Sequence, residues 1–458
     1  MARLRGVAAF VLLVTALAGC DADPVVPAPA PSERTVDGSP AGSAPVGPAD
    51  WPTYHRDQAR SGVAPGFPAP GTVHQAWRSR LDGAVYGQPL VIGDTLFAAT
   101  EHDTVYALDA ATGATRWSTH VGEPMPRKQL PCGNIDPLGI TSTMVYDPAT
   151  GLVFALAETL GAHHTLYGLD ARTGAVRVSR AAEPPKGDPV AHQQRAALNL
   201  LDGRVYIAYG GLAGDCGQYI GSVVSVPTTG TGAPVSYAVP TPREGGIWAP
   251  GGGAVHNGQL LYAVGNGESS SDYDGSDSVL RLDRDLKLVD RFAPVTWAED
   301  NDADLDLGSL TSVVVNGYVF TAGKRGTGYT LRPNHLGGIG GQVGQGPVCK
   351  AYGGPAVDGD TIYVPCRDGV RAVRVAADGQ IHVRWQAAVP ARGSPVVSGG
   401  AVWVVDYDGG VLYALDPATG AVRQQLPIGK APHFASPTLA NGRVYVGTLD
   451  GVTAVSPS

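Results

Sequence analysis

The sequence predicts an all-β fold, specifically an eight-bladed β-propeller of four-stranded antiparallel blades, and three observations lead to this prediction. A short hairpin pattern recurs along the chain, first as Val105–Trp117 and again as Leu166–Gly174 and Leu412–Gly420. The units that contain it follow one another at intervals of about 40 to 60 residues, a spacing typical of propeller blades. An unassigned strand ahead of the first unit matches a strand that the last unit lacks.

The hairpin has a simple physical basis. Each copy combines a short apolar strand, an Asp that begins a turn, a Gly that allows a positive φ, and a second strand. Because the strands are almost entirely apolar rather than alternating, we expect both of their faces to be covered. A hairpin cannot bury both faces alone, so the copies must stack on one another.

Eight such units can be counted. Each begins with small residues or Pro and continues into an apolar strand, and a second strand follows. The second strands contain, in order, Leu96-Phe97, Val153-Phe154, Val205-Tyr206, Leu261-Tyr262, Val319-Phe320, Ile362-Tyr363, Val402-Trp403 and Val444-Tyr445.

The two ends of the repeat region are complementary. The last unit ends in the strand Gly451–Val455 and has no fourth strand, whereas the strand Val73–Leu81 precedes the first unit. Its Trp77 occupies the position held by Trp117 and Trp385 in other units. We therefore expect Val73–Leu81 to complete the final blade and close the ring, which removes exposed sheet edges.

The N-terminal segment is typical of a targeting signal. Residues 1–19 combine early arginines with the apolar run Val7–Leu17, which is too short to span a membrane. Leu17-Ala-Gly-Cys20 resembles the lipobox of bacterial lipoproteins, which implies cleavage before Cys20 and its lipidation. We expect anchoring to the extracytoplasmic face of the cell membrane; the alternative is an ordinary secretory signal with a chance cysteine.

Composition sets the remaining domain boundaries. Residues 20–50 are rich in Pro, Ala, Ser and Gly, so we expect a disordered tether there. Residues 51–458 form the predicted propeller. The net charge of −8 is mild and no basic run occurs, which argues against nucleic acid as a partner. We expect a monomer.

Four cysteines remain for an oxidising compartment, namely Cys132, Cys216, Cys349 and Cys366. They allow three disulfide pairings. We favour Cys349–Cys366, because these two lie close together within one unit. This choice leaves Cys132–Cys216 to connect loops of different units. The spacing does not suit a zinc cluster.

At Ala107–Trp117 the pattern A-L-D-x-x-T-G-x-x-x-W resembles the repeat of quinoprotein dehydrogenases and of the non-catalytic assembly lipoproteins built on the same eight-bladed propeller. The resemblance covers about residues 70 to 458. For the dehydrogenases it implies pyrroloquinoline quinone and calcium in the central funnel. Fold alone does not decide between the two activities.

The resemblance implies four site residues. Trp248 matches the indole on which the quinone lies, and Asn266 matches a calcium ligand. Asp306 matches the catalytic Asp, which also binds the metal, and Lys324 matches the basic residue that contacts the quinone carbonyls. The chemistry fits, because calcium prefers oxygen ligands, a carboxylate can accept an alcohol proton and an aromatic face can stack on a planar quinone.

Each residue also has a purely structural interpretation. Trp248 could pack between blades, Asn266 could occupy a left-handed turn, and Lys324 could cap an exposed turn. Asp306 could belong to a solvated acidic loop that begins at Asp300.

The sequence also departs from the dehydrogenase pattern. It contains no adjacent Cys-Cys pair, and it has no C-x-x-C-H haem motif that would hold an electron carrier. The Glu of the calcium site is expected near Asp215–Gly217, where only Asp215 offers a carboxylate.

These departures favour a function without a cofactor, as a membrane-anchored module that binds a protein or a cell-envelope component. The alternative is a calcium- and pyrroloquinoline-quinone-dependent alcohol dehydrogenase that passes electrons to a separate acceptor.

Overall fold

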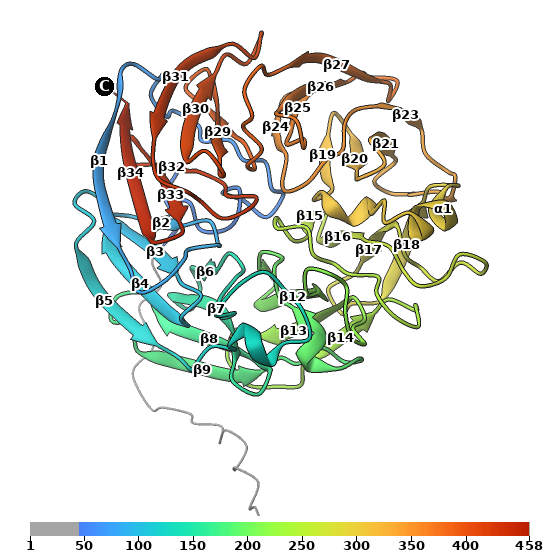
Figure 1. The fold of residues 1–458 in the computed structure, drawn as a ribbon, viewed down its shortest axis with the longest axis horizontal. Coiled ribbons are helices and arrows are strands. Elements are labelled where there is room, and N and C mark those ends of the chain that lie inside the picture. Colours follow the sequence, from blue (N-terminus) through green and yellow to red (C-terminus); the bar gives the residue numbers. More distant parts are fainter. Residues whose placement is uncertain (1–44, 458) are drawn as a thin grey trace, which may run out of the picture. The chain divides into compact units, whose positions relative to one another are not determined.

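A computed structural model describes residues 45–457 as a ring of eight antiparallel sheets (Figure 1). The predicted eight-bladed propeller is therefore confirmed. The expected signal peptide, the lipidation site Cys20 and residues 20–44 of the expected tether lie outside the described residues. Within the described part of the chain, no helix is long and apolar enough to cross a membrane.

The first four blades follow one another in sequence. Blade 1 comprises β2 (Leu90–Ile92), β3 (Thr95–Ala99), β4 (Thr104–Asp109) and β5 (Thr115–His120). Blade 2 comprises β6 (Val145–Asp147), β7 (Leu152–Thr159), β8 (His163–Asp170) and β9 (Val176–Ala181). Blade 3 comprises β10 (His192–Gln193), β11 (Asn199–Leu201), β12 (Arg204–Gly211), β13 (Ser222–Pro227) and β14 (Val235–Ala238). Blade 4 comprises β15 (Ala254–His256), β16 (Gln259–Val264), β17 (Ser278–Leu282) and β18 (Leu288–Ala293), to which β22 (Gly338–Ile339) adds in parallel.

The remaining blades complete the circle. Blade 5 comprises β19 (Val313–Val315), β20 (Tyr318–Ala322), β21 (Thr327–Leu331) and β23 (Gly344–Pro347). Blade 6 comprises β24 (Ala356–Asp358), β25 (Thr361–Val364), β26 (Arg371–Val375) and β27 (Ile381–Gln386). Blade 7 comprises β28 (Val396–Ser398), β29 (Ala401–Asp406), β30 (Val411–Leu415) and β31 (Val422–Pro427). Blade 8 comprises β32 (Thr438–Ala440), β33 (Arg443–Thr448), β34 (Gly451–Pro457) and β1 (Val73–Arg80).

Helical structure is confined to connections. The α-helix α1 (Trp297–Asp302) and the 3-10 turns η1 (Arg127–Gln129), η2 (Pro189–Ala191) and η3 (Leu307–Ser309) all lie between strands. Two of them, α1 and η3, flank Asp306.

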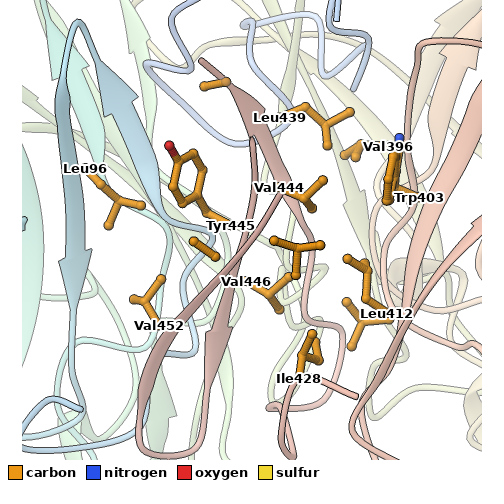
Figure 2. Close-up of a cluster of buried hydrophobic side chains, with 14 of the residues drawn as sticks. Leu96, Val396, Trp403, Leu412, Ile428, Leu439, Val444, Tyr445, Val446 and Val452 are labelled. Carbon is orange, nitrogen blue, oxygen red and sulfur yellow. The ribbon is translucent and has the colours of Figure 1, made fainter. Parts of the chain in front are cut away.

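Apolar strands pack face to face between neighbouring blades. One cluster joins blades 7, 8 and 1: Trp403 of β29 and Val444 and Val446 of β33 are at most 1% exposed, and Leu96 of β3 is fully buried (Figure 2). Because both faces of β33 are covered in this way, its central residues Val444–Val446 are apolar or aromatic, as the repeat pattern predicted.

The strand β1 closes the ring. It pairs antiparallel with β34, so that the strand nearest the start of the described chain lies beside the strand at its end (Figure 1). Trp77 lies opposite Ala454 in this pairing. The predicted role of residues 73–81 is therefore confirmed.

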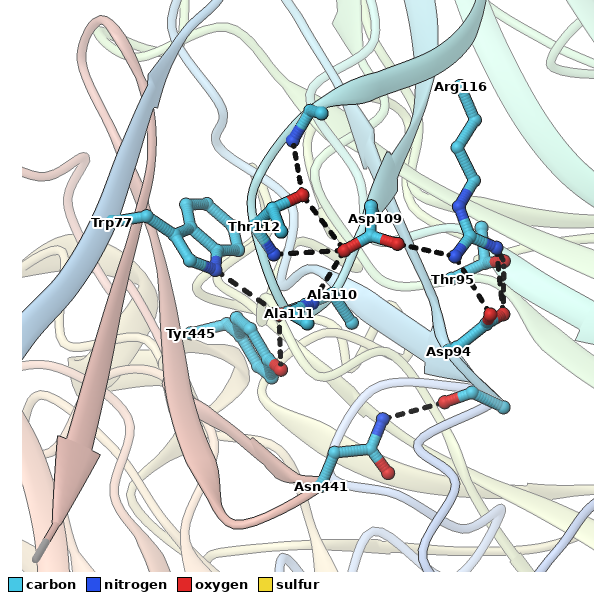
Figure 3. Close-up of polar contacts among 12 residues, drawn as sticks. Trp77, Asp94, Thr95, Asp109, Ala110, Ala111, Thr112, Arg116, Asn441 and Tyr445 are labelled. Atoms are coloured by element: carbon cyan, nitrogen blue, oxygen red, sulfur yellow. Dashed lines mark hydrogen bonds and ion pairs between the residues drawn. The ribbon is translucent and has the colours of Figure 1, made fainter.

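The geometry that the hairpins share explains why Trp recurs in them. The indole nitrogen of Trp77 donates a hydrogen bond to the carbonyl oxygen of Ala110 (3.2 Å) in the first turn of blade 1 (Figure 3). Trp117 and Trp385 make the same bond to the turn of the next blade. The ring of Trp77 also covers Gly113, where a Cβ would lie 2.6 Å from the indole. Each Trp thus fastens one blade to the next.

Both favoured disulfides are present. Cys349 pairs with Cys366 and Cys132 pairs with Cys216, as predicted. The first bond joins the segment after β23 of blade 5 to the segment after β25 of blade 6, so the pairing was correct but its placement within one unit was wrong. The second joins the loops ahead of β6 and after β12.

Residues 51–64 tie the inner strands of several blades together. Trp51 exchanges backbone hydrogen bonds with Val91 of β2 (2.7 and 3.1 Å), and Val255 of β15 donates to the carbonyl of Gln58 (2.7 Å). Arg60 is fully buried, and its guanidinium donates to the carbonyls of Gly253 and Leu198 (both 3.0 Å). This segment was not anticipated from the repeat pattern.

Candidate active site

The loops that lead into the innermost strands enclose one large cavity of about 730 Å³. Tyr86 precedes β2, Arg195 precedes β11, Trp248 precedes β15, Asp306 precedes β19 and Phe434 precedes β32. Because these inner strands surround the ring axis, side chains that are distant in sequence converge on the mouth of the axial channel. The cavity is the central funnel that the resemblance led us to expect.

Three of the four predicted site residues line this funnel, namely Trp248, Asp306 and Lys324. The fourth, Asn266, follows β16 and contacts Asp306 from behind: its backbone N–H donates to the Asp306 Oδ1 (2.8 Å). All four therefore belong to one site, contributed by blades 4 and 5.

Asp306 and Lys324 form a buried ion pair. Lys324 Nζ lies 2.5 Å from Asp306 Oδ2 and 2.6 Å from Asp304 Oδ1. Asp306 is 4% exposed, and burial raises the pKa of its carboxyl group, with Lys324 opposing part of that rise. Burial would lower the pKa of Lys324, but Asp306 and Asp304 raise it above its usual value, so Lys324 stays protonated.

Close backbone packing fixes the position of Asp306. A Cβ at Gly265 would lie 2.2 Å from its Oδ1, and a Cβ at Gly323 would lie 2.1 Å from its carbonyl oxygen. Only glycine fits at these two positions. Backbone segments on both sides therefore fix the position of Asp306, and a catalytic or binding side chain requires such a fixed position.

Trp248 forms part of the aromatic wall beside this pair. Lys324 Nζ lies 5.9 Å from the centre of the Trp248 ring, and the Phe434 ring lies 6.1 Å from it. The indole is half-buried, so a face remains available to a planar ligand. Its approach to β12 depends on Gly210, where a Cβ would come 2.9 Å from that of Trp248.

A second carboxylate completes a set of oxygen ligands. Asn266 Nδ2 donates to Glu244 Oε2 (3.3 Å), so the Asn266 amide lies between the carboxylates of Glu244 and Asp306. With the amide in this orientation, its oxygen faces only acceptors. Rotating the amide removes this conflict, because its nitrogen then donates to both carboxylate oxygens of Asp306, with Oδ2 at 3.2 Å.

This donor set fits a hard cation such as calcium, which takes carboxylate and amide oxygens. Among residues 45–457, no three His, Cys, Asp or Glu side chains are grouped so as to hold a metal ion. The site has two carboxylates, Glu244 and Asp306, and the amide of Asn266 would supply a third protein ligand to such a cation.

Glu244 is the residue that sequence reasoning missed. We expected the carboxylate near Asp215, but Asp215 lies on another part of the wall and accepts a hydrogen bond from the Tyr219 hydroxyl (2.6 Å). Glu244 reaches the site because Gly245 donates its N–H to the carbonyl of Asn266 (2.8 Å). The sequence feature that could have identified Glu244 is its position four residues before Trp248.

The disulfide Cys132–Cys216 supports the same wall. Its neighbours Asn134, Ile135 and Asp215 line the funnel, although the sulfur atoms do not. The bond packs in a small apolar cluster with Leu212. It therefore holds two lining loops together rather than covering the ligand.

Two curated relatives are similar to the chain. It is 28% identical over 254 residues to a polyvinylalcohol dehydrogenase from Sphingopyxis sp. (strain 113P3), covering 50% of this chain and 36% of that protein. It is 23% identical over 459 residues to a polyvinylalcohol dehydrogenase from Pseudomonas sp., covering 81% of this chain and 68% of that protein. The chain thus spans about a third of the first relative.

A solved structure shares the fold. The quinohemoprotein alcohol dehydrogenase from Comamonas testosteroni superposes with a TM-score of 0.67 at 15% identity, over 89% of this chain and 80% of that one. At this identity the likeness concerns the fold. A family model described as outer membrane protein assembly factor BamB matches residues 71–210 and 296–458, and the chain therefore belongs to this PQQ_2 family of propellers.

Proposed function

We propose that this protein is an alcohol dehydrogenase that uses pyrroloquinoline quinone and calcium in the central funnel. The observation that carries the proposal is the buried Asp306 carboxylate, held by Lys324 and Asn266 next to the half-buried face of Trp248. The relatives named as polyvinylalcohol dehydrogenases support it. They favour this function over the binding function that the sequence alone favoured.

The residues that would hold the cofactors are already close together. Trp248 and Phe434 offer aromatic faces for a planar ring system. Glu244, Asn266 and Asp306 offer oxygens for calcium. When bound, the quinone would accept the two electrons of the alcohol, and calcium would polarise it as a Lewis acid.

Asp306 is the proposed general base. Its carboxylate would accept the hydroxyl proton of an alcohol, and the rise of its pKa on burial strengthens it as a base while Lys324 keeps it ionised. Lys324, which stays protonated, would stabilise negative charge that develops on a neighbouring oxygen. The funnel walls would exclude water from this pair.

The proposed substrate class is a secondary alcohol, by analogy with the relatives. Electrons would leave to a separate acceptor, because the chain has no C-x-x-C-H haem motif. Lipidation at Cys20 and an extracytoplasmic, membrane-anchored location remain part of the proposal.

A binding function is the second candidate, because the family model is described as an assembly factor. In that case the funnel or its rim would hold a protein or cell-envelope component, and Asp306 and Lys324 would be structural. The two candidates differ in whether the funnel takes up the quinone.

The test is reconstitution of the purified protein with pyrroloquinoline quinone and calcium, followed by a dye-linked assay with poly(vinyl alcohol) and small secondary alcohols. We expect cofactor-dependent dye reduction that falls by at least about 10²- to 10⁴-fold in Asp306→Asn, because the substitution removes both the general base and a calcium ligand. Asp408→Asn, a carboxylate change across the funnel, is the matched control. Absence of any quinone-dependent activity would support the binding function instead.

A further inference from the structure

A second, smaller pocket of about 200 Å³ adjoins the funnel on its rim. The two cavities share part of their walls, namely the side chains Tyr352, Tyr407, His433 and Phe434. Cys366, Arg367 and Arg392 line the smaller cavity alone, which we call the side pocket. Its residues come from loops ahead of and within blades 6, 7 and 8, across the funnel from the loops of blades 4 and 5 that carry the proposed catalytic pair.

The wall of the side pocket is fixed by backbone contacts. The N–H of Tyr352 donates to the carbonyl of Pro365 (3.1 Å), and the N–H of Arg367 donates to the carbonyl of Lys350 (2.9 Å). The disulfide between blades 5 and 6 joins the same two segments. The side pocket is therefore preformed, which lowers the cost of ordering its wall around a ligand.

A row of aromatic rings leads from the proposed catalytic pair to the side pocket. Lys324 lies over Trp248, and the Phe434 ring lies 6.1 Å from that of Trp248. On its other side Phe434 stacks on Tyr352, with ring centres 6.4 Å apart and an angle of 13° between the planes. Phe434 also adopts φ +67°, a conformation that bulky residues rarely take and that clusters at functional sites. The row offers a continuous apolar surface to an aliphatic chain.

The side pocket also offers hydrogen-bond donors, with little net charge. The guanidinium of Arg392 lies 5.2 Å from the ring centre of Tyr407 and is paired with Asp408. Its Nε is buried and has no hydrogen-bond partner among the described residues. Arg367 is exposed and forms no ion pair with residues 45–457. Because one of the two guanidiniums is already neutralised, these donors suit uncharged acceptors such as hydroxyl groups better than a polyanion.

A long alcohol needs a place for the part of its chain that does not react. A chain that carries many secondary hydroxyls, such as poly(vinyl alcohol), can place only one of them at Asp306, so its neighbouring units must lie along the funnel wall. Its aliphatic backbone suits the rings of Tyr352 and Phe434, and its hydroxyls suit the donors of Arg367 and Arg392. Contacts with such units supply binding energy away from the reacting carbon.

We propose that the side pocket binds the units of a long, polyhydroxylated alcohol that flank the hydroxyl group at Asp306. The inference deepens the proposed function and rests on it for the reaction, although not for the binding of the chain. It makes the side pocket the feature that favours long alcohols over short ones.

The first arm of the test measures, by calorimetry, how short poly(vinyl alcohol) oligomers bind to the protein without quinone. We expect Tyr352→Ala and Arg367→Gln each to weaken this binding about tenfold, the usual effect of losing an aromatic contact or a hydrogen bond from a charged donor. Tyr352→Phe, which keeps the ring, should bind as the unchanged protein does. Arg384→Gln is the matched control, since Arg384 of β27 is an exposed arginine of blade 6 outside both cavities.

The second arm compares kcat/KM of the quinone-loaded protein for the oligomers and for 2-butanol, which has a single hydroxyl group. We expect the ratio of the two values to fall about tenfold in Tyr352→Ala and in Arg367→Gln, mainly through KM for the oligomers. The ratio should not change in Arg384→Gln. Because Arg367 is exposed, its variant remains informative even if Tyr352→Ala fails to fold.

A third arm replaces the oligomers by acrylate oligomers, which have the same carbon backbone but carry carboxylates. Tighter binding of these than of the alcohol oligomers, dependent on Arg367, would identify a polyanion site and overturn the inference.

The remaining outcomes separate the inference from the proposed function. Equal oligomer binding and an equal kcat/KM ratio in all variants would overturn the inference and leave the proposed function standing. Oligomer binding that depends on Tyr352 and Arg367, without oxidation of any alcohol, would keep the side pocket and overturn the proposed function. Absence of both oligomer binding and activity would overturn both.

Discussion

Replacing Trp77 by alanine tests whether β1 closes the ring. Trp77 is 9% exposed, donates to the Ala110 carbonyl (3.2 Å) and packs 5.8 Å from the Tyr445 ring (Figure 3). The Tyr445 hydroxyl donates to the same carbonyl (3.0 Å). The substitution therefore removes a contact between the last blade and the first.

The expected loss is about 3 to 5 kcal/mol of unfolding free energy. This is the usual range for removal of a buried aromatic side chain, and it includes the cavity left behind. The lost hydrogen bond contributes about 1 kcal/mol within it, and the Tyr445 bond limits the damage at Ala110. The measurement is urea-induced unfolding followed by circular dichroism.

Trp117→Ala is the matched control, because Trp117 donates to the Ala171 carbonyl at the same distance (3.2 Å) between blades 1 and 2. If all blades share one cooperative ring, the two variants should be destabilised by similar amounts. A Trp77→Ala protein within about 1 kcal/mol of the original, beside a strongly destabilised Trp117→Ala protein, would refute the closure of the ring by β1.

Three further predictions follow from buried groups, glycines and disulfides. Burial, reinforced by Glu101, raises the pKa of Asp103 to about 9, so the folded protein retains this proton where the unfolded chain releases it. The contribution of this proton to the free energy of unfolding is full below about pH 4 and falls as the pH rises toward 9. Asp103→Asn should therefore flatten the fall in melting temperature between pH 5 and 9. An unchanged slope would contradict this. Gly323→Ala would place a Cβ 2.1 Å from the Asp306 carbonyl oxygen and should weaken calcium binding, measured by calorimetry, more than tenfold. Gly359→Ala is the control: a Cβ there meets no atom within 4 Å, so calcium binding should be unchanged. Removing Cys132–Cys216, which spans 84 residues, should lower the free energy of unfolding by about 1.4 kcal/mol more than removing Cys349–Cys366, which spans 17. The reverse order in thermal unfolding would contradict this.

The fold could be predicted because its signals are local and repeated. The Asp and Gly of each hairpin set a turn, and Trp77, Trp117 and Trp385 recur because each caps the same turn in the next blade. The pairing of Cys349 with Cys366 followed from their closeness in sequence.

The segment at residues 51–64 could not be predicted because it repeats nothing. Arg60 is fully buried although charged residues are usually exposed, and its partners Gly253 and Leu198 lie far away in sequence. Contacts of this kind depend on the closed ring, which a pattern of neighbouring residues does not encode.

The candidate site was predictable only in part. Trp248, Asp306 and Lys324 could be placed on one funnel through the family resemblance. Glu244 was missed because it approaches Asn266 from the loop between β14 and β15, a contact that is visible only in three dimensions.

The account depends most on calcium and the quinone binding together at Glu244, Asn266 and Asp306. Equilibrium dialysis of the purified protein against pyrroloquinoline quinone and calcium measures this directly. The account predicts one quinone and one calcium ion retained per chain, with both lost in Glu244→Gln and in Asp306→Asn. Failure of the unchanged protein to retain them, or equal retention by both variants, would contradict it.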